Sequence, residues 1–445
     1  MSEKPIVGFV GLGAMGFGMA ANLVKQGYQV KGFDVFPKSV ERFQQQGGIA
    51  ATSLADSAAN AAFHVLMVAS ADQAQSALFG EGDSIVKALP QGATLLLCST
   101  VPSAYAQSVE KQLADIGRSD IFFVDAPVSG GAKRAADGTL TIMVGASDAA
   151  TEKARWLLEE MSDPKGLYIV PGGVGQGSNM KMVHQVLAAI QILLASEAHG
   201  FAARLGLDAK EVYDAICKSP EWFWMYENRV PRTLAEDYTP PVSALTIILK
   251  DAGIITSIAR LVNFPTPLSS AAEQVYLIGL NEGRGSLDDA AMVRTYFPDP
   301  VSTVKPESNG ASSPSNSEKL DLVFKLLRGV LLLAAAEAIS FAHYLKLDLH
   351  QFYDLASGAA GASIAFRERG AEMIELLTGK KVAGAREGLQ PLDVKQIRED
   401  LAEAINAGRK LYCPVPLAGA ALNLLATAQR VAGDQKEKSY FGLLQ

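Results

Sequence analysis

The stretch Ile6-Val-Gly-Phe-Val10-Gly11-Leu-Gly13-Ala-Met15-Gly16 joins a short apolar strand to a glycine turn and opens a helix that continues to about Lys25. In a G-x-G-x-x-G turn, the first glycine permits the tight turn and the second lets the backbone approach a pyrophosphate. The third glycine lets the helix pack closely against the strand, and N–H groups at the helix start suit phosphates. The stretch predicts the first turn of a dinucleotide-binding fold, with the dinucleotide held at Gly11, Gly13, Met15 and Gly16.

A second predicted strand, residues 29–33, ends at Asp34, which lies 23 positions beyond Gly11 (34 − 11). A carboxylate at this place accepts a hydrogen bond from the adenosine ribose 2′-OH and repels a 2′-phosphate. The three residues after Asp34 supply no arginine to bind such a phosphate. The sequence therefore favours NAD as the cofactor, while Lys38 leaves NADP open.

The strand and helix alternation continues with apolar strands over residues 63–68 and 93–98, as expected for a parallel sheet. Thr100 follows the second of these strands, at the strand end where open α/β sheets bind their ligands. Its hydroxyl suits the nicotinamide ribose. The alternative is a helix cap, by Thr100 or Ser103, for the predicted helix 104–116.

Another apolar strand, residues 121–124, leads into Asp125-Ala-Pro-Val-Ser129-Gly130-Gly131. Two unhindered backbone N–H groups and a hydroxyl in Ser-Gly-Gly suit a carboxylate ligand. The alternative is an ordinary glycine loop, and this segment alone does not decide between the two.

A long helix is predicted after Gly175-Gln-Gly-Ser-Asn-Met-Lys181, because apolar residues recur at helical spacing as far as Leu207. Lys181 lies in the first turns, where the helix dipole disfavours a cation, so helix stability does not explain it. A lysine that faces a closed pocket gives up its proton more easily and can exchange protons near neutral pH. The alternative is a solvated surface lysine.

Four motifs in this order resemble the β-hydroxyacid dehydrogenases: GLGAMG at 11–16, Asp34, DAPVSGG at 125–131 and GQGSNMK at 175–181. The resemblance covers about residues 5–297, and the family includes 3-hydroxyisobutyrate, tartronate-semialdehyde and L-threonate dehydrogenases. It implies that Lys181 is the catalytic general acid/base and that Lys250 reaches substrate and cofactor from a later helix. It also implies that the substrate carboxylate binds to Ser129, Gly130 and Gly131.

The family usually has an asparagine four residues after the catalytic lysine, and Gln185 stands there in this chain. This substrate-binding position points to a threonate-like branch. Oxidation of an alcohol by NAD needs loss of a hydride and of the hydroxyl proton, and one lysine both accepts the proton and stabilises the charge on oxygen. We expect NAD-dependent oxidation of a small β-hydroxy acid or sugar acid. The alternatives are an NAD(P)H-dependent semialdehyde reductase of the tartronate type and a non-catalytic dinucleotide-binding scaffold.

The chain beyond residue 318 repeats the preceding helical region at a constant offset of 140 (323 − 183), since Val183, Leu187, Glu197, Phe201, Tyr213 and Asp214 return as Val323, Leu327, Glu337, Phe341, Tyr353 and Asp354. Lys181 falls opposite Asp321, and Lys250 falls opposite Glu399 at an offset of 149. The copy has kept the apolar frame and lost the catalytic lysine. We hypothesise an internal pseudo-dimer, and hence a monomer, with a homodimer as the alternative.

The expected architecture is an α/β Rossmann domain (1–174) followed by a helical catalytic domain (175–298), a linker (299–318) and a degenerate second helical domain (319–445). Both helical domains resemble the C-terminal domain of 6-phosphogluconate dehydrogenase. A net charge of −7 excludes a nucleic-acid surface, and three cysteines and five histidines without motif spacing exclude a disulfide framework and a metal site. No signal segment and no apolar run of membrane-spanning length are expected, which predicts a cytoplasmic protein without membrane contact.

Overall fold

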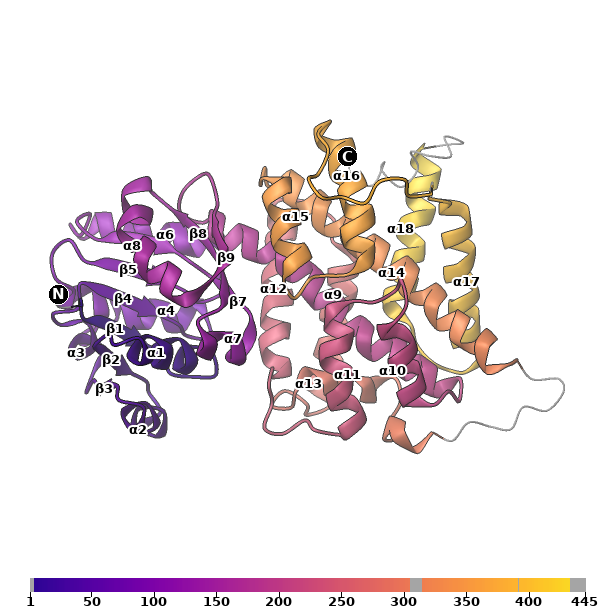
Figure 1. Cartoon of the computed structure of the whole chain (residues 1–445), viewed down its shortest axis with the longest axis horizontal. Helices are drawn as coiled ribbons and strands as arrows, with labels where there is room; N and C mark the ends of the chain where they lie inside the picture. The colour runs from indigo at the N-terminus through magenta and orange to yellow at the C-terminus, as the bar shows by residue number, and fades with distance from the viewer. Residues whose placement is uncertain (1–3, 305–313, 391, 433–445) are drawn as a thin grey trace. The chain divides into compact units, whose positions relative to one another are not determined.

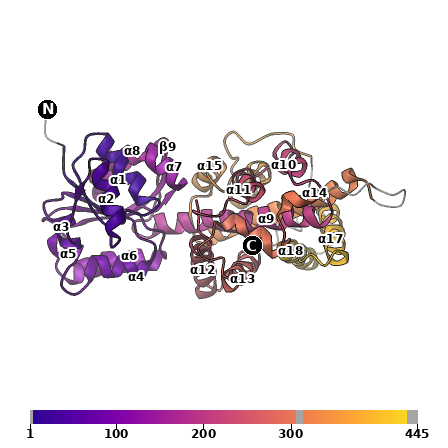
Figure 2. The same cartoon turned by 90° about the horizontal axis from the view of Figure 1, so that it is seen from below.

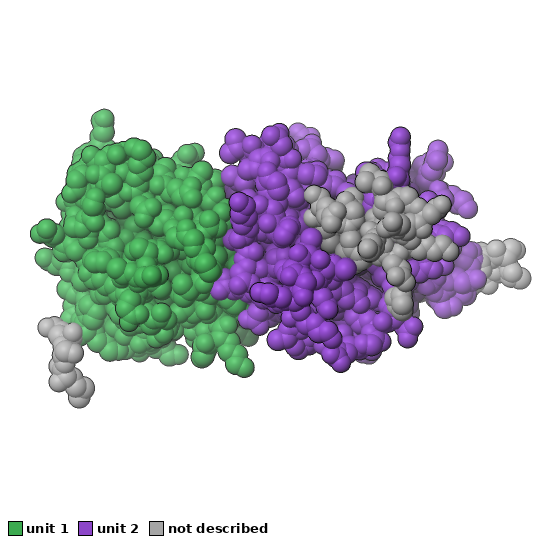
Figure 3. Space-filling view, turned by 90° about the horizontal axis from the view of Figure 1, so that it is seen from above, with its two compact units in different colours: residues 1–182 green, residues 183–445 purple. Residues whose placement is uncertain are grey.

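The structure is a computed structural model and describes residues 4–304, 314–390 and 392–432. The chain forms two compact units, residues 1–182 and residues 183–445, which Figure 3 shows in different colours. Both expected helical domains thus belong to one compact unit. Part of the expected linker, residues 305–313, lies outside the described residues, and helix α14 begins within the expected range of the linker, at Asn316.

The described part of the first unit contains a nine-stranded sheet in the order β3-β2-β1-β4-β5-β6-β8-β7, with β9 paired to β8 (Figure 1). Strands β1 to β6 are parallel, as predicted, whereas β8 runs antiparallel to β6 and β7. The strands are β1 (Val7–Val10), β2 (Val30–Phe33), β3 (Ile49–Ala50), β4 (Phe63–Leu66), β5 (Thr94–Leu97), β6 (Phe122–Asp125), β7 (Val128–Ser129), β8 (Leu140–Ala146) and β9 (Ser162–Ile169).

Helices cover both faces of this sheet because successive residues of each buried strand point to opposite faces. Val65 and Leu96 pack into one core with α1 and α8, whereas their neighbours Leu66 and Leu97 pack into a second core with α4 and α6. This explains why the strands read as continuous apolar runs. The helices are α1 (Gly16–Lys25), α2 (Pro37–Gln45), α3 (Leu54–Ala58), α4 (Ala71–Phe79), α5 (Ile85–Ala88), α6 (Ser103–Asp115), α7 (Gly131–Asp137) and α8 (Asp148–Met161).

Helical elements of the second unit recur at the spacing that the sequence repeat predicts. Helix α9 (Gln176–Arg204), which begins in the first unit, and α14 (Asn316–Tyr344) have the same length and lie 140 positions apart. Helices α12 (Leu245–Leu261) and α17 (Val394–Lys410) match in the same way at 149 positions. The remaining matched elements are α10 (Ala209–Cys217) with α15 (Leu349–Gly358), α11 (Trp224–Ala235) with η3 and α16 (Phe366–Gly370 and Ala371–Thr378), and α13 (Pro267–Asn281) with α18 (Pro416–Ala432).

Contacts between these two sets of helices are reciprocal. Glu197 of α9 accepts hydrogen bonds from the N–H groups of Leu417 and Ala418 at the start of α18. Its counterpart Glu337 of α14 accepts the equivalent bonds from Leu268 and Ser269 at the start of α13. Each copy therefore caps a helix N-terminus of the other copy with a buried carboxylate.

A short antiparallel bridge joins the two copies in the same symmetrical way. Trp224 N–H donates to Ala362 O at 2.9 Å, and Ile364 N–H donates to Trp222 O at 3.2 Å. These two bonds exchange under the offset of 140, as expected for contacts that lie about a two-fold axis. Helices α9 and α14 lie in the middle of the helical unit, with the other helices around them (Figures 1 and 2).

Helix α9 corrects one sequence expectation. An 18-residue window of it has a mean hydropathy of 1.5, which is long and apolar enough to cross a membrane. The prediction that no run reaches this length was wrong, because a single charged residue, Glu197, does not lower the mean enough. All of that window is buried inside the protein, as in the core helix of a soluble protein.

Candidate functional site

The predicted cofactor residues follow strands whose carboxyl ends share one edge of the sheet. Gly11 follows β1, Asp34 follows β2 and Thr100 follows β5, and all three strands are parallel. Asp125, at the end of β6, lies at the same edge. Open α/β sheets bind their ligands at this edge.

The glycine turn has the geometry that its three glycines require. A Cβ atom on Gly11, whose φ is +94°, would lie 2.1 Å from Met67 O, and one on Gly16 would lie 1.9 Å from Gly11 O. Around Gly13, by contrast, a Cβ atom would meet nothing within 4 Å. The turn is closed where strand and helix meet and open where a pyrophosphate would approach, so these residues fit a dinucleotide. Met15, the N-cap residue of α1, is half-buried beside this turn.

The carboxylate of Asp34 holds the end of β2 against the glycine turn. Its Oδ2 accepts a hydrogen bond from Leu12 N–H at 2.6 Å, and its Oδ1 accepts one from Phe36 N–H at 2.9 Å. Each carboxylate oxygen can accept a second bond, so this anchoring is compatible with the predicted bond from a ribose hydroxyl.

Thr100 is half-buried and lies three residues before the start of α6 at Ser103. Ser103 is the first helical residue and Pro102 is the N-cap, so the prediction of Ser103 as the N-cap was wrong. Its neighbour Ser99 has a structural role, since its Oγ accepts a hydrogen bond from Val68 N–H at 2.8 Å.

The Ser-Gly-Gly segment connects β7 to α7. Ser129 is buried and pairs with Thr141 of β8. Gly130 and Gly131 have φ values of +142° and +74°, which L side chains rarely adopt, and a Cβ on Gly131 would meet nothing within 4 Å. The glycines are thus needed for the backbone path, and Gly131 borders open space.

Asp125 fixes the start of α9, a role that the sequence did not reveal. Its Oδ2 accepts hydrogen bonds from Gly175 N–H at 3.1 Å and Ser178 N–H at 2.8 Å, and its Oδ1 accepts one from Ser178 Oγ at 2.6 Å. Burial raises the pKa of Asp125 to about 6, although the bonds from Ser178 and Gly175 favour the charged form. A buried carboxylate at a helix N-terminus satisfies free N–H groups and complements the helix dipole.

Two glycines bring α9 into backbone contact with the sheet. A Cβ on Gly145 of β8 would lie 2.5 Å from Gly177 N, and one on Gly177 would lie 2.5 Å from Met143 O. Gly145 and Gly177, the second glycine of the GQG motif, therefore allow the helix to pack closely on β6 and β8. Together with Asp125 they determine where the first turns of α9 lie.

Lys181 lies in the second turn of α9 and is only 5% exposed. The surface-lysine alternative was therefore wrong. Lysine is almost never this buried unless its ammonium group has a specific environment, so this residue is a candidate for chemistry.

The second unit contributes a pair of predicted residues joined by one carboxylate. Asp251 of α12 accepts a hydrogen bond from Gln185 Nε2 at 2.6 Å and forms an ion pair with Lys250 Nζ at 3.0 Å. Gln185 and Asp251 are both buried. Sequence reasoning selected Gln185 and Lys250 but missed Asp251, because helices α9 and α12 lie 66 positions apart at this contact.

The catalytic arrangement does not recur in the second copy. Asp321, which stands where Lys181 stands in the first copy, forms an ion pair with Lys325 at 2.9 Å. Lys325 also contacts Glu403 of α17 at 2.7 Å. Lys325, which stands opposite Gln185, is therefore paired with two carboxylates.

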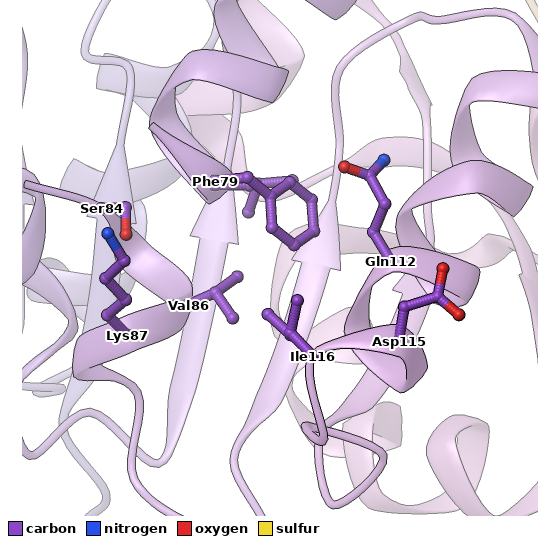
Figure 4. A pocket seen from close by; sticks show the side chains of 8 residues that line it. Phe79, Ser84, Val86, Lys87, Gln112, Asp115 and Ile116 are labelled. Atoms are coloured by element: carbon purple, nitrogen blue, oxygen red, sulfur yellow. The ribbon is translucent and has the colours of Figure 1, made fainter. Parts of the chain in front are cut away.

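A small cavity in the first unit, of about 220 Å³, lies between α4, α5 and the end of α6 (Figure 4). Among its lining residues, Asp115 is the last residue of α6 and Ile116 follows it, so the cavity is at the opposite edge of the sheet from Gly11 and Asp34. It is separate from the candidate cofactor site.

Two family models match consecutive parts of the chain. The NAD-binding domain of 6-phosphogluconate dehydrogenase matches residues 6–175, and the domain described as NAD-binding of NADP-dependent 3-hydroxyisobutyrate dehydrogenase matches residues 175–296. The L-threonate dehydrogenase of Cupriavidus necator is 36% identical over 65% of this chain and 95% of its own. Human mitochondrial 3-hydroxyisobutyrate dehydrogenase is 32% identical over 65% of this chain and 85% of its own.

Solved structures agree with these matches. The 3-hydroxyisobutyrate dehydrogenase of Salmonella typhimurium, 33% identical, superimposes with a TM-score of 0.61 over 66% of this chain and 100% of its own. The 6-phosphogluconate dehydrogenase of Plasmodium falciparum, at 17% identity, shares the fold over 98% of this chain and 94% of its own, with a TM-score of 0.65. The expected Rossmann and helical fold is confirmed, and so is NAD(P) as the cofactor. The chain belongs to the β-hydroxyacid dehydrogenase family and is an NAD(P)-dependent oxidoreductase that acts on a CH–OH group.

Proposed function

We propose that this protein oxidises a small β-hydroxy acid or sugar acid of the threonate or 3-hydroxyisobutyrate kind, with Lys181 as the general acid/base. The observation that carries the proposal is a lysine only 5% exposed, on a helix whose start is fixed by Asp125 at the ligand-binding edge of the sheet. The names of the relatives, L-threonate and 3-hydroxyisobutyrate dehydrogenase, support this substrate class.

Each proposed residue has one role in the reaction. Ser129, Gly130 and Gly131 bind the carboxylate of the acid through their N–H groups and the serine hydroxyl, and Gln185 and Lys250 hold its other polar groups. Neutral Lys181 accepts the hydroxyl proton as the alcohol becomes a carbonyl, and its N–H groups stabilise the charge on that oxygen. Bound NAD supplies the hydride acceptor. Lys250 also borders the cofactor in this proposal.

The preference for NAD over NADP rests on Asp34. Its carboxylate stands at the end of β2 and is anchored on the glycine turn through Leu12. We infer that it accepts a bond from the ribose 2′-OH and repels a 2′-phosphate. The glycine turn, Met15 and Thr100 complete the proposed cofactor contacts.

The test is NADH formation across L-threonate, D-erythronate, 3-hydroxyisobutyrate, glycerate and serine, each with NAD and with NADP. Turnover of one acid with NAD supports the proposal, and a Lys181→Ala variant should then lose about 10²–10⁴-fold in kcat while it still binds NAD. If Lys181→Ala keeps the turnover of the wild type, Lys181 is not the general acid/base. NAD binding without oxidation of any acid would contradict the substrate class.

We further propose that the chain is a monomer whose two helical copies form an internal pseudo-dimer. The reciprocal caps by Glu197 and Glu337 and the symmetrical bridge at residues 222–224 and 362–364 support this proposal. Each copy covers the apolar helices that a second subunit would otherwise cover. A sedimentation mass near 47.1 kDa is expected, and a dimer or tetramer mass would contradict the proposal. We also infer a soluble, cytoplasmic protein.

A further inference from the structure

We propose that the second helical copy, although it has lost the catalytic lysine, forms one wall of the hydroxy-acid site through residues 359–364. This inference rests on the proposed function of Lys181. It assigns the copy a role in substrate recognition in addition to covering apolar surface.

Residues 359–364 are fixed directly against helix α9. Gln191 Nε2 donates a hydrogen bond to Gly361 O at 3.0 Å, and both residues are buried. A Cβ atom on Gly361 would lie 3.0 Å from Leu187 Cδ1 and 3.6 Å from His184 Cδ2. The hydrogen bonds between Ala362 and Trp224 and between Ile364 and Trp222 also hold the segment in place.

The contacted part of α9 adjoins the face that carries the proposed catalytic groups. His184, Leu187 and Gln191 form a stripe at spacings of three and four residues, so they share one side of the helix. His184 lies three residues after Lys181 and directly before Gln185, which places it on the neighbouring stripe. A shift of His184 by the second copy therefore acts on the same helical turn as Lys181 and Gln185.

The two copies differ in this segment in a way that packing symmetry does not explain. Residues 358–363 read Gly-Ala-Ala-Gly-Ala-Ser, whereas their counterparts 218–223 read Lys-Ser-Pro-Glu-Trp-Phe. The bulky version contacts the second copy's own long helix, where Glu221 forms an ion pair with Arg328 at 2.9 Å. The small version contacts α9, the helix that has kept its lysine. Residues 358–363 are thus small at the place where a large side chain would contact His184.

The test compares Gly361→Ala and Gly361→Val with Gly358→Ala. The first two place atoms against Leu187 and His184, whereas a Cβ on Gly358, three residues earlier, would meet nothing within 4 Å. We expect Gly361→Ala to raise KM for the acid at least fivefold and Gly361→Val to raise it further, with an unchanged dissociation constant for NAD. Gly358→Ala should match the wild type in both quantities.

A second measurement uses the wild-type protein, so it does not depend on whether a variant folds. Amide hydrogen exchange is followed in residues 359–364 with NAD alone and with NAD plus the acid that the wild type turns over, from the panel above. We expect the acid to slow exchange there and to leave the exchange rates of residues 219–221 unchanged, which are counterparts of 359–361 and form none of the hydrogen bonds of the bridge.

The outcomes separate this inference from the proposed function. If the wild type oxidises an acid but Gly361→Ala keeps its KM, and the acid gives no protection at 359–364, the second copy is only a packing partner and the inference is wrong. A fall in melting temperature without a change in KM has the same meaning. Absence of turnover and acid binding in the wild type instead refutes the proposed function, and this inference with it.

Discussion

The start of α9 offers the sharpest test of how the fold positions Lys181. In Asp125→Ala, the N–H groups of Gly175 and Ser178 lose their buried acceptor, while the Ser178 hydroxyl can turn to another partner. In Asp125→Asn, the amide oxygen can take the place of Oδ2 and keep both backbone bonds. Neither variant ionises at this position, so the two differ mainly in these hydrogen bonds.

An unsatisfied buried donor costs about 1–3 kcal/mol, so the two N–H groups predict that Asp125→Ala is less stable than Asp125→Asn by about 2–6 kcal/mol. Loosening of the first turn also displaces Lys181, and a misplacement of about 1 Å costs on the order of 100-fold in rate. We therefore expect Asp125→Ala to lose about 100-fold in kcat relative to Asp125→Asn.

Urea unfolding gives the stability difference, and NADH formation under saturating acid and NAD gives kcat. Asp120 provides the control, since it precedes the same strand at the opposite edge of the sheet and accepts a hydrogen bond from Gly92 N–H at 2.8 Å. Asp120→Ala should lower stability without lowering kcat. If Asp125→Ala and Asp125→Asn unfold within about 1 kcal/mol of each other and share one kcat, Asp125 does not position the lysine.

Three further predictions concern the other carboxylates. Burial raises the pKa of Glu337 from 4.5 to about 7, so the folded state holds this proton more tightly than the unfolded state does. The free energy of unfolding therefore includes a contribution that is present at acid pH and is lost as pH rises through 7. The stability lost at Glu337 is about 3 kcal/mol. Glu337→Gln should therefore reduce the fall of urea stability between pH 5 and 8 without abolishing it, because burial also raises the pKa of Glu197 to about 7. An unchanged slope would contradict this reasoning. Asp251→Asn keeps the bond from Gln185 but weakens the ion pair with Lys250, so KM for the acid, measured by NADH formation, should rise about tenfold, and an unchanged KM would contradict the role of this ion pair. Asp34→Ser should lower the preference for NAD, measured as kcat/KM with NAD divided by kcat/KM with NADP, by about 10–100-fold. An unaltered ratio would show that another residue distinguishes the ribose 2′-OH from a 2′-phosphate.

The sequence alone was sufficient wherever function depends on local backbone. The turn from Gly11 to Gly16 and the alternation of strands and helices that follows were predictable, because glycine conformation and the spacing of apolar residues depend on neighbouring residues. The helical repeat was also predictable from the sequence, because the constant offset that relates Glu197 to Glu337 can be found without knowing what either residue contacts.

Only the tertiary structure showed what those carboxylates contact. Asp125 reaches Ser178 across 53 positions, Asp251 reaches Gln185 across 66, and Glu197 reaches Leu417 across 220. Such pairs leave no periodic signal in the chain, because each is made by packing of elements that are remote in sequence. For the same reason the contact between Gly361 and α9 was invisible beforehand. The sequence determined which helices form and which lysine was kept, and the packing of two unlike copies decided what surrounds them.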